Sequence, residues 1–203
     1  MFIKKNLDKY FSDQIKKCWD SDQLLRILPN MLNEMLMQNY TPTKTMVNYM
    51  VNCCQSKNDY EVAAKIMKME NIPLDNITYT SLIDIFHRRR HWKHAFSAIE
   101  MVEKNLNNSN KTNTNININT SHEKNNYNVI PTVAMYNKVM DTCVRAGESD
   151  VAMNVLLKMK QIGLSPNASS WNIALNACAK LNQWDTAKNI MIHWQKEQME
   201  NVV

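Results

Sequence analysis

Apolar residues in this chain follow the spacing of amphipathic helices, and the helical pattern itself repeats. The clearest unit is residues 133–167, in which apolar side chains fall three and four residues apart on both sides of Gly147. A similar unit begins at Ala168, which gives a period of 35 residues. Counting Val133 as position 1, the pattern predicts two antiparallel helices in each unit.

Three positions of this unit recur along the chain with similar side chains. Position 4 is aromatic or β-branched, as in Val47, Tyr79, Tyr136 and Trp171. Position 11 is compact or apolar, as in Cys54, Phe86, Cys143 and Cys178. Position 20 is alanine, as in Ala63, Ala95, Ala152 and Ala187. Stacked units of this kind bury a continuous core, so we expect an all-α, right-handed solenoid of about five helix pairs.

The predicted helix ends recur as well. Gly147 and Gly163, the two glycines of the chain, stand at positions 15 and 31, where a left-handed residue commonly ends a helix. Asparagine, the second choice for that conformation, takes the same places in other units: Asn58 and Asn182, and Asn39, Asn71 and Asn128. Proline, which blocks continuation, stands at position 34 or one place earlier: Pro42, Pro73, Pro131 and Pro166.

These signals predict a single array over residues 1–203. The repeats are 9–43 (degenerate, with Pro29 inside its second helix), 44–75, 76–132, 133–167 and 168–202. The third repeat carries an insert at about 105–126 that consists almost wholly of Asn, Thr, Ser and Lys. Such a composition cannot bury enough apolar surface to offset the entropy of ordering, so we expect a disordered loop there.

Composition and charge narrow the possible partners. The net charge of +5 permits a polyanionic partner without requiring one. No apolar run is long enough to span a bilayer, so we expect no membrane association. The amphipathic N-terminus MFIKKNLDKYF lacks arginine and is not an evident targeting segment. With no secretory signal, we expect the five cysteines to be reduced.

The sequence contains few residue patterns that are typical of a catalytic or metal-binding site. The cysteines have no C-x2-C spacing and three of them share position 11, so packing is the simpler role. The segment HRRRHWKHAF puts its histidines on both sides of a turn, which leaves a phosphate-contacting basic turn or a plain solvated turn open. We find no nucleophile–histidine–acid set and no glycine-rich phosphate loop. We therefore expect no enzymatic activity, metal, cofactor or small-molecule substrate.

The unit 133–167 resembles the pentatricopeptide-repeat (PPR) family. The resemblance is carried by Tyr136, Asn137, Ala152, Met159, Gly163 and Pro166. It extends over nearly the whole chain and is weakest in 9–43. The family resemblance implies an RNA-binding protein of a mitochondrion or plastid-type organelle, in which each repeat reads one unstacked base.

In the family, position 5 and the last position of a repeat select the base. Carried over, the pairs are Asn48 with Asp75, Thr80 with Thr132, Asn137 with Asn167, and Asn172 with Val202. The resemblance implies uracil for the first pair and a pyrimidine for the third, and Thr80 leans to purines. Val202 cannot form a side-chain hydrogen bond.

Two further positions carry implied roles. Position 2, which packs on the base in the family, is Thr45, Ile77, Ala134 and Ser169, where the family usually has valine. Position 13, which faces the RNA backbone, is Arg88, Arg145 and Lys180 in three consecutive repeats. An ordinary solvated face with cations near helix C-termini explains the same row.

Three functions stay open. The first is single-stranded RNA binding in organellar RNA processing, stability or translation. The second is a structural subunit of an organellar ribonucleoprotein such as a mitochondrial ribosome, held by ribosomal RNA backbone and other proteins. The third is a protein-binding scaffold without RNA affinity.

Overall fold

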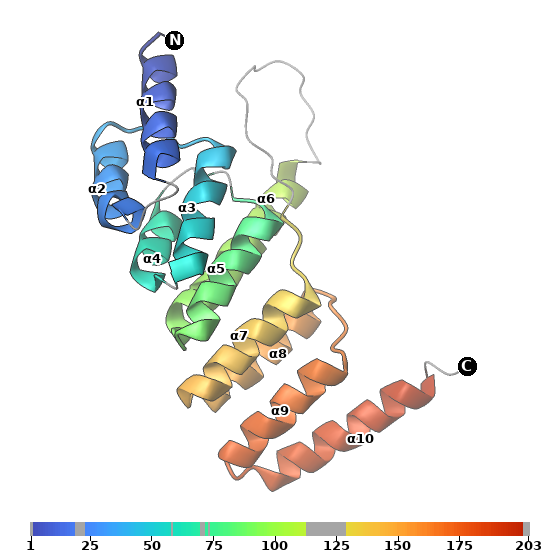
Figure 1. The fold of residues 1–203 in the computed structure, drawn as a ribbon. Coiled ribbons are helices and arrows are strands. Elements are labelled where there is room, and N and C mark those ends of the chain that lie inside the picture. Colours follow the sequence, from blue (N-terminus) through green and yellow to red (C-terminus); the bar gives the residue numbers. More distant parts are fainter. Residues whose placement is uncertain are drawn as a thin grey trace. The chain divides into compact units, whose positions relative to one another are not determined.

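The computed structural model describes residues 2–18, 23–57, 59–69, 72, 74–112 and 129–200. Within these ranges the chain forms ten α-helices and no strand, which confirms the predicted all-α class with about five helix pairs (Figure 1). The helices are α1 (Phe2–Cys18), α2 (Gln23–Met37), α3 (Lys44–Lys57), α4 (Tyr60–Lys68), α5 (Asn76–Arg88), α6 (Trp92–Thr112), α7 (Val133–Ala146), α8 (Ser149–Gln161), α9 (Ala168–Lys180) and α10 (Trp184–Glu200).

The helices belong to two compact units, Met1–Ile85 with Glu100–Ile130, and Phe86–Ile99 with Pro131–Val203. In the first unit α1 and α2 pack on each other and on α3, and α4 packs on α2 and α3. In the second unit α7, α8 and α9 pack on one another and α10 packs on α9. The single array over residues 1–203 stays a prediction.

The recurring apolar positions are buried in the core, except that Ala187 of the fifth repeat is half-buried. The side chains at position 4 are at most 2% exposed in Val47, Tyr79, Tyr136 and Trp171. The position 11 side chains of Cys54, Phe86, Cys143 and Cys178 are fully buried. Alanine at position 20 is fully buried in Ala63, Ala95 and Ala152. The small methyl group there lets two helix backbones approach closely, which explains why the same residue recurs.

The predicted left-handed helix ends are confirmed where the structure describes them. Gly147 has φ +90° and Gly163 has φ +82°, and Asn39 and Asn182 have φ +47° and +55°. Each is followed by the hydrogen bond of a Schellman cap, for example from Glu148 N to the carbonyl oxygen of Cys143 at 2.9 Å. Asn58, Asn71 and Asn128 lie outside the described residues.

Arg90 at position 15 adopts the same left-handed conformation, with φ +58°. The next amide, His91 N, donates to the carbonyl oxygen of Phe86 at 2.9 Å, so the cap is of the same type. A side chain with a Cβ pays about 1–2 kcal/mol for this conformation. The repeat therefore imposes the cap even where neither glycine nor asparagine is present.

Two predicted boundaries are corrected. Helix α1 begins at Phe2 rather than near residue 9. Helix α6 continues to Thr112, so the start of the insert predicted as a loop at 105–126 is helical. Residues 105–112 contain neither proline nor glycine to stop the helix, and Asn105 Nδ2 donates to the hydroxyl of Tyr79 at 3.2 Å. Residues 113–128 lie outside the described ranges.

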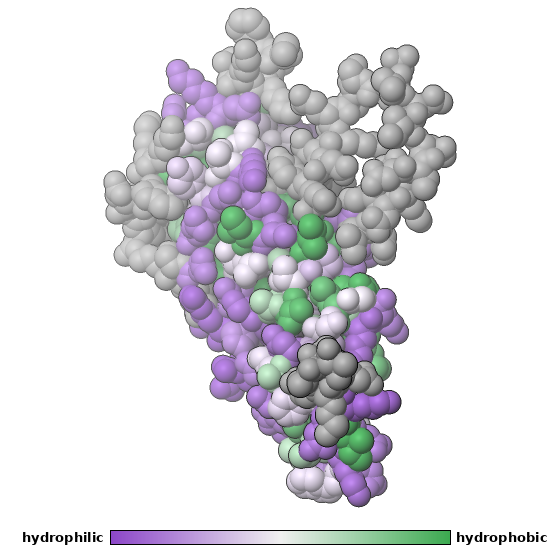
Figure 2. Space-filling view, turned by 90° about the vertical axis from the view of Figure 1, so that its right-hand side faces the viewer, coloured by the Kyte–Doolittle hydropathy of each residue, from purple (hydrophilic) through white to green (hydrophobic). Residues whose placement is uncertain are grey.

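Apolar side chains also reach the surface. In the space-filling view they appear in scattered places among polar side chains (Figure 2). Among the residues whose side chains the structure describes, the large apolar ones that are at least two-thirds exposed are Met37, Ile77 and Trp184. None of the described helices combines the length and the apolar character that a bilayer crossing requires.

Candidate nucleic-acid interface

The last residue of each well-formed repeat caps the first helix of the next one. Asp75 accepts from Thr78 N at 2.8 Å, Thr132 from Met135 N at 3.3 Å, and Asn167 from Ser170 N at 3.0 Å. A short side-chain oxygen at this place satisfies one of the backbone amides that a helix N-terminus leaves without an acceptor. The capping role therefore fixes the orientation of three predicted base-selecting side chains.

In the second unit, Asn137 and Asn167 form a closed polar group with Ser170. Asn137 Nδ2 donates to Asn167 Oδ1 at 3.1 Å. The Ser170 hydroxyl lies 2.7 Å from Asn137 Oδ1 and 3.1 Å from Asn167 Oδ1, and its single proton serves one of them. Asn137 is 9% exposed, so its amide is held between α7 and α9.

The first unit contains a related group, Asn48, Asp75 and Thr78, which is joined through the Thr78 hydroxyl. The Thr78 hydroxyl lies 2.7 Å from Asn48 Oδ1 and 2.6 Å from Asp75 Oδ1. Lys44 Nζ lies 2.9 Å from Asp75 Oδ2. Burial raises the pKa of Asp75, but hydrogen bonds from Thr78 and Lys44 outweigh it and lower the pKa to about 2. Asp75 is thus an anion at neutral pH.

We call these two groups, Asn48–Asp75–Thr78 and Asn137–Asn167–Ser170, the polar triads. Each brings together the two residues of one predicted base-selecting pair. The third member, a hydroxyl residue at position 3 of the following repeat, was not predicted as part of a site. Its signal is a Ser or Thr three residues after Asp or Asn, which indicates a capping interaction. The repeat 44–75 contributes to a triad although it is three residues shorter than the 35-residue period.

The other two predicted pairs are not joined by described contacts. The Thr80 hydroxyl donates to the carbonyl oxygen of Asn76 at 2.7 Å, whereas Thr132 caps α7 and belongs to the other unit. Asn172 is exposed on α9, and Val202 lies outside the described residues. Only the first and third pairs therefore have a defined local geometry.

The predicted base-packing residues all lie on the surface of first helices. Thr45, Ala134 and Ser169 are exposed, and Ile77 is 75% exposed. Burying an exposed isoleucine against a flat ring gains apolar contact, whereas the three small side chains offer little area.

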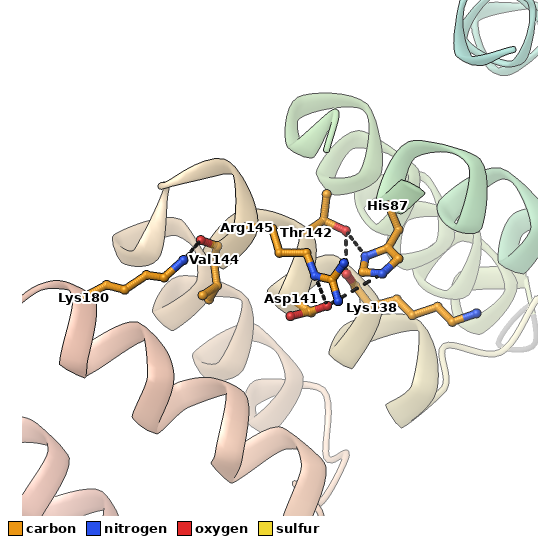
Figure 3. A network of polar contacts seen from close by, with 7 residues as sticks. All are labelled: His87, Lys138, Asp141, Thr142, Val144, Arg145 and Lys180. Carbon is orange, nitrogen blue, oxygen red and sulfur yellow. Dashed lines mark hydrogen bonds and ion pairs between the residues drawn. The ribbon is translucent and has the colours of Figure 1, made fainter. Parts of the chain in front are cut away.

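Arg145 and Lys180, which are predicted to contact the RNA backbone, make contacts within the protein (Figure 3). Arg145 Nε lies 2.8 Å from Asp141 Oδ2, one helical turn earlier, and the Arg145 side chain is 53% exposed. Lys180 Nζ donates to the carbonyl oxygen of Val144 at 2.6 Å, near the C-terminus of α7. Arg88 is exposed at the end of α5. An ammonium or guanidinium group can add a phosphate oxygen to such contacts, because each has several N–H donors.

His87 links this region to α7 and was not predicted to do so. Its Nδ1 lies 3.0 Å from the Thr142 hydroxyl, and its Nε2 lies 3.6 Å from Asp141 Oδ2 (Figure 3). Asp141 therefore lies between His87 and Arg145. Side-chain contacts of this kind depend on rotamers and leave no pattern in the sequence.

The buried cysteines have the character of packing residues. Cys54, Cys143 and Cys178 are free thiols with no exposed surface. Burial raises the pKa of the Cys143 thiol to about 12 and also raises the pKa values of Cys54 and Cys178. Within the described residues, no group of three or more His, Cys, Asp or Glu side chains is arranged to hold a metal ion.

Comparison with known proteins gives sequence and fold matches. A PPR repeat family model matches residues 131–180, and a PPR repeat model matches 77–105 and 169–199. No curated protein sequence gives a significant match.

Two solved structures have a similar fold. The pentatricopeptide repeat protein PPR10 from maize is 18% identical with a TM-score of 0.56, over 93% of this chain and 24% of the maize chain. The PPR domain of protein-only RNase P 1 from Arabidopsis thaliana, in complex with tRNA, is 10% identical with a TM-score of 0.56, over 93% of this chain and 89% of that chain. The chain thus spans about a quarter of the maize protein.

Proposed function

This chain belongs to the pentatricopeptide-repeat family, and we propose that it binds single-stranded RNA along the first helices of its repeats. The observation that carries the proposal is the recurrence of the polar triad in two repeats. In each triad the residues that would select a base are held side by side by a hydroxyl of the next repeat. Capping a helix requires only the last residue of the repeat, Asp75 or Asn167. It does not require an additional polar side chain at position 5, such as Asn48 or Asn137, in the same group.

The triads would present a fixed hydrogen-bonding edge to one base each. Asn137 and Asn167 carry both donors and acceptors, as recognition of a pyrimidine edge requires. Asp75 would supply an acceptor next to the amide of Asn48, which fits the N3–H donor of uracil. Because the protein already orients these groups, little side-chain entropy is lost when a base binds.

The free energy available from base stacking limits how tightly this chain can bind RNA on its own. Stacking contributes about 1–3 kcal/mol per base, and four repeats near the low end give roughly 4–6 kcal/mol. A dissociation constant of 1 mM corresponds to about 4 kcal/mol, so base stacking alone supports only weak binding. We therefore propose that the protein works with other proteins in a larger assembly, within a mitochondrion or plastid-type organelle as the family resemblance implies.

One observation favours a second function, a structural subunit of an organellar ribonucleoprotein such as a mitochondrial ribosome. Thr45, Ala134 and Ser169 are exposed where a base would pack, but their side chains are too small to cover its face. A subunit held by ribosomal RNA backbone and by neighbouring proteins would not need that cover. In either function the protein acts as a non-enzymatic binding module.

Titration of short oligonucleotides that differ at a single nucleotide tests the proposal. Asn137→Thr should shift the preference at one nucleotide from pyrimidine toward purine and leave the salt dependence unchanged. Asn154→Thr, the same substitution at an exposed position of α8, is the matched control. If RNA binds but Asn137→Thr behaves like the control, base reading is wrong and the ribonucleoprotein subunit takes its place. Absence of any RNA affinity would leave the protein-binding scaffold.

A further inference from the structure

The turn between α5 and α6 carries more positive charge than the repeat fold requires. Positions 14–18 of the third repeat are Arg89, Arg90, His91, Trp92 and Lys93. The same positions are Ala-Gly-Glu-Ser-Asp in 146–150 and Leu-Asn-Gln-Trp-Asp in 181–185. The latter two turns form the same Schellman cap without a single cation.

Lys93 is unfavourable for the helix that contains it. It is the second residue of α6, and the positive end of the helix dipole disfavours a cation in the first turn. The equivalent residues are Glu61, Asp150 and Asp185, all acids that the dipole favours. Local helix stability therefore does not account for a lysine at this position.

Arg90 is also unfavourable for the backbone that contains it. Its φ of +58° is left-handed, where Gly147 and Asn182 stand in the fourth and fifth repeats. Arg90 and Lys93, two residues of one turn, thus each lower the stability of the fold while adding positive charge. Unfavourable backbone conformations of this kind cluster at functional sites.

The charged side chains surround a hollow of about 530 Å³. It lies between this turn and the end of α7, and it is lined by Arg90, His91, Trp92, Lys93, His94, Arg145 and Ala146. No acidic residue is among the lining residues. Lys93 Nζ lies 5.7 Å from the centre of the Trp92 ring, and the rings of His91 and His94 are 6.0 Å apart.

We propose that this hollow binds phosphate groups of the single-stranded RNA, with Arg90 and Lys93 as the principal contacts. The inference rests on the proposed function and adds a specific anchor for the RNA backbone at one turn of the array. Arg145 is already paired with Asp141, so Arg90 and Lys93 are the lining cations that a phosphate group would meet. Contacts of this kind to the RNA backbone carry no base preference.

The double variant Arg90→Asn/Lys93→Asp tests this anchor, because it installs the residues found in the equivalent turn of the fifth repeat. We expect its thermal midpoint to equal or exceed that of the wild type. Binding of a labelled oligouridine should weaken about tenfold at about 0.1 M salt. The slope of log K against log salt should become shallower by about 0.7 for each phosphate that the variant no longer neutralises. Lys93→Gln alone should give a smaller change of the same kind.

Lys65→Asn/Lys188→Asp, which makes the same change of charge at exposed positions of α4 and α10, is the matched control. Equal weakening in this control, or unchanged affinity and slope in the turn variant, would overturn the inference. The proposed function can hold even if the turn variant keeps its affinity and slope. It holds in that case if the wild type binds RNA and Asn137→Thr shifts the base preference. A wild type that binds no RNA would remove both.

Discussion

The Nδ1 atom of His87 lies 3.0 Å from the hydroxyl oxygen of Thr142, 55 residues further along the chain. Thr142 itself donates its hydroxyl proton to the carbonyl oxygen of Lys138 at 2.6 Å. Because a hydroxyl has a single proton, Thr142 must accept from His87, and the histidine therefore carries its proton on Nδ1. The hydrogen bond ties the end of α5 to the middle of α7.

Thr142→Val should destabilise the protein by about 1 kcal/mol, because it keeps the side-chain volume but removes the acceptor of His87. Thr80→Val is the matched control, since the Thr80 hydroxyl donates to the carbonyl oxygen of Asn76 in the same way. Urea unfolding would measure both variants. Equal effects of the two substitutions would show that the His87 hydrogen bond contributes nothing to stability.

Gly147→Val and Gly163→Val should each destabilise the protein by about 1–2 kcal/mol or more, because a β-branched side chain is strained at these positive φ values. No heavy atom lies within 4 Å of a Cβ built at either glycine, so the cost comes from the backbone rather than from a clash. Arg90→Gly should have the opposite sign and raise the thermal midpoint. Unchanged midpoints in all three variants would contradict the left-handed assignment.

Asp75 should make stability depend on acid pH. Burial raises its pKa, but Thr78 and Lys44 lower the pKa from 3.8 to about 2 in the folded protein. The stabilisation is therefore complete above about pH 4 and is lost as the pH falls toward 2. In Asp75→Asn the cap keeps an oxygen acceptor but does not titrate. The stability advantage of wild type over Asp75→Asn, measured by denaturant unfolding, should shrink between these pH values; a constant difference would contradict the assignment.

Arg88→Gln, Arg145→Gln and Lys180→Gln should each weaken RNA binding about equally for all sequences. If each of these cations neutralises one phosphate, the slope of log K against log salt should fall by about 0.7 per residue removed. Arg145 and Lys180 also contact Asp141 and the Val144 carbonyl oxygen, so unfolding of these variants must be measured in parallel. Lys188→Gln serves as the control, and a slope unchanged in all three variants would mean that this row only faces solvent.

The backbone of the repeat was largely predictable because it is encoded redundantly. Buried side chains such as Tyr136 and Cys143 recur with the period, and so do the residues that end helices, such as Gly147 and Asn182. The left-handed Arg90 has no signal of its own. Only its place at position 15 indicates it, which shows that the repeat register carries more information there than residue type.

The side-chain geometry of the site was predictable only in part. The pairing of Asn137 with Asn167 followed from the family resemblance, but the bridging role of Ser170 did not. The bond from Lys180 to the Val144 carbonyl oxygen depends on how two helices approach each other. A residue pattern specifies which face of a helix is buried, but it does not specify side-chain rotamers or the distances between polar atoms.

The double use of Asp75, Thr132 and Asn167 restricts how such a protein can change its target. Each caps the start of a helix through a short side-chain oxygen, and each is also a predicted base-selecting residue. The set of side chains that begin a helix well is essentially Asp, Asn, Ser and Thr. A change of base preference at this position is therefore compatible with a stable helix start only if the new residue is one of these four. Most other residues would lower the stability of the helix as well as change recognition.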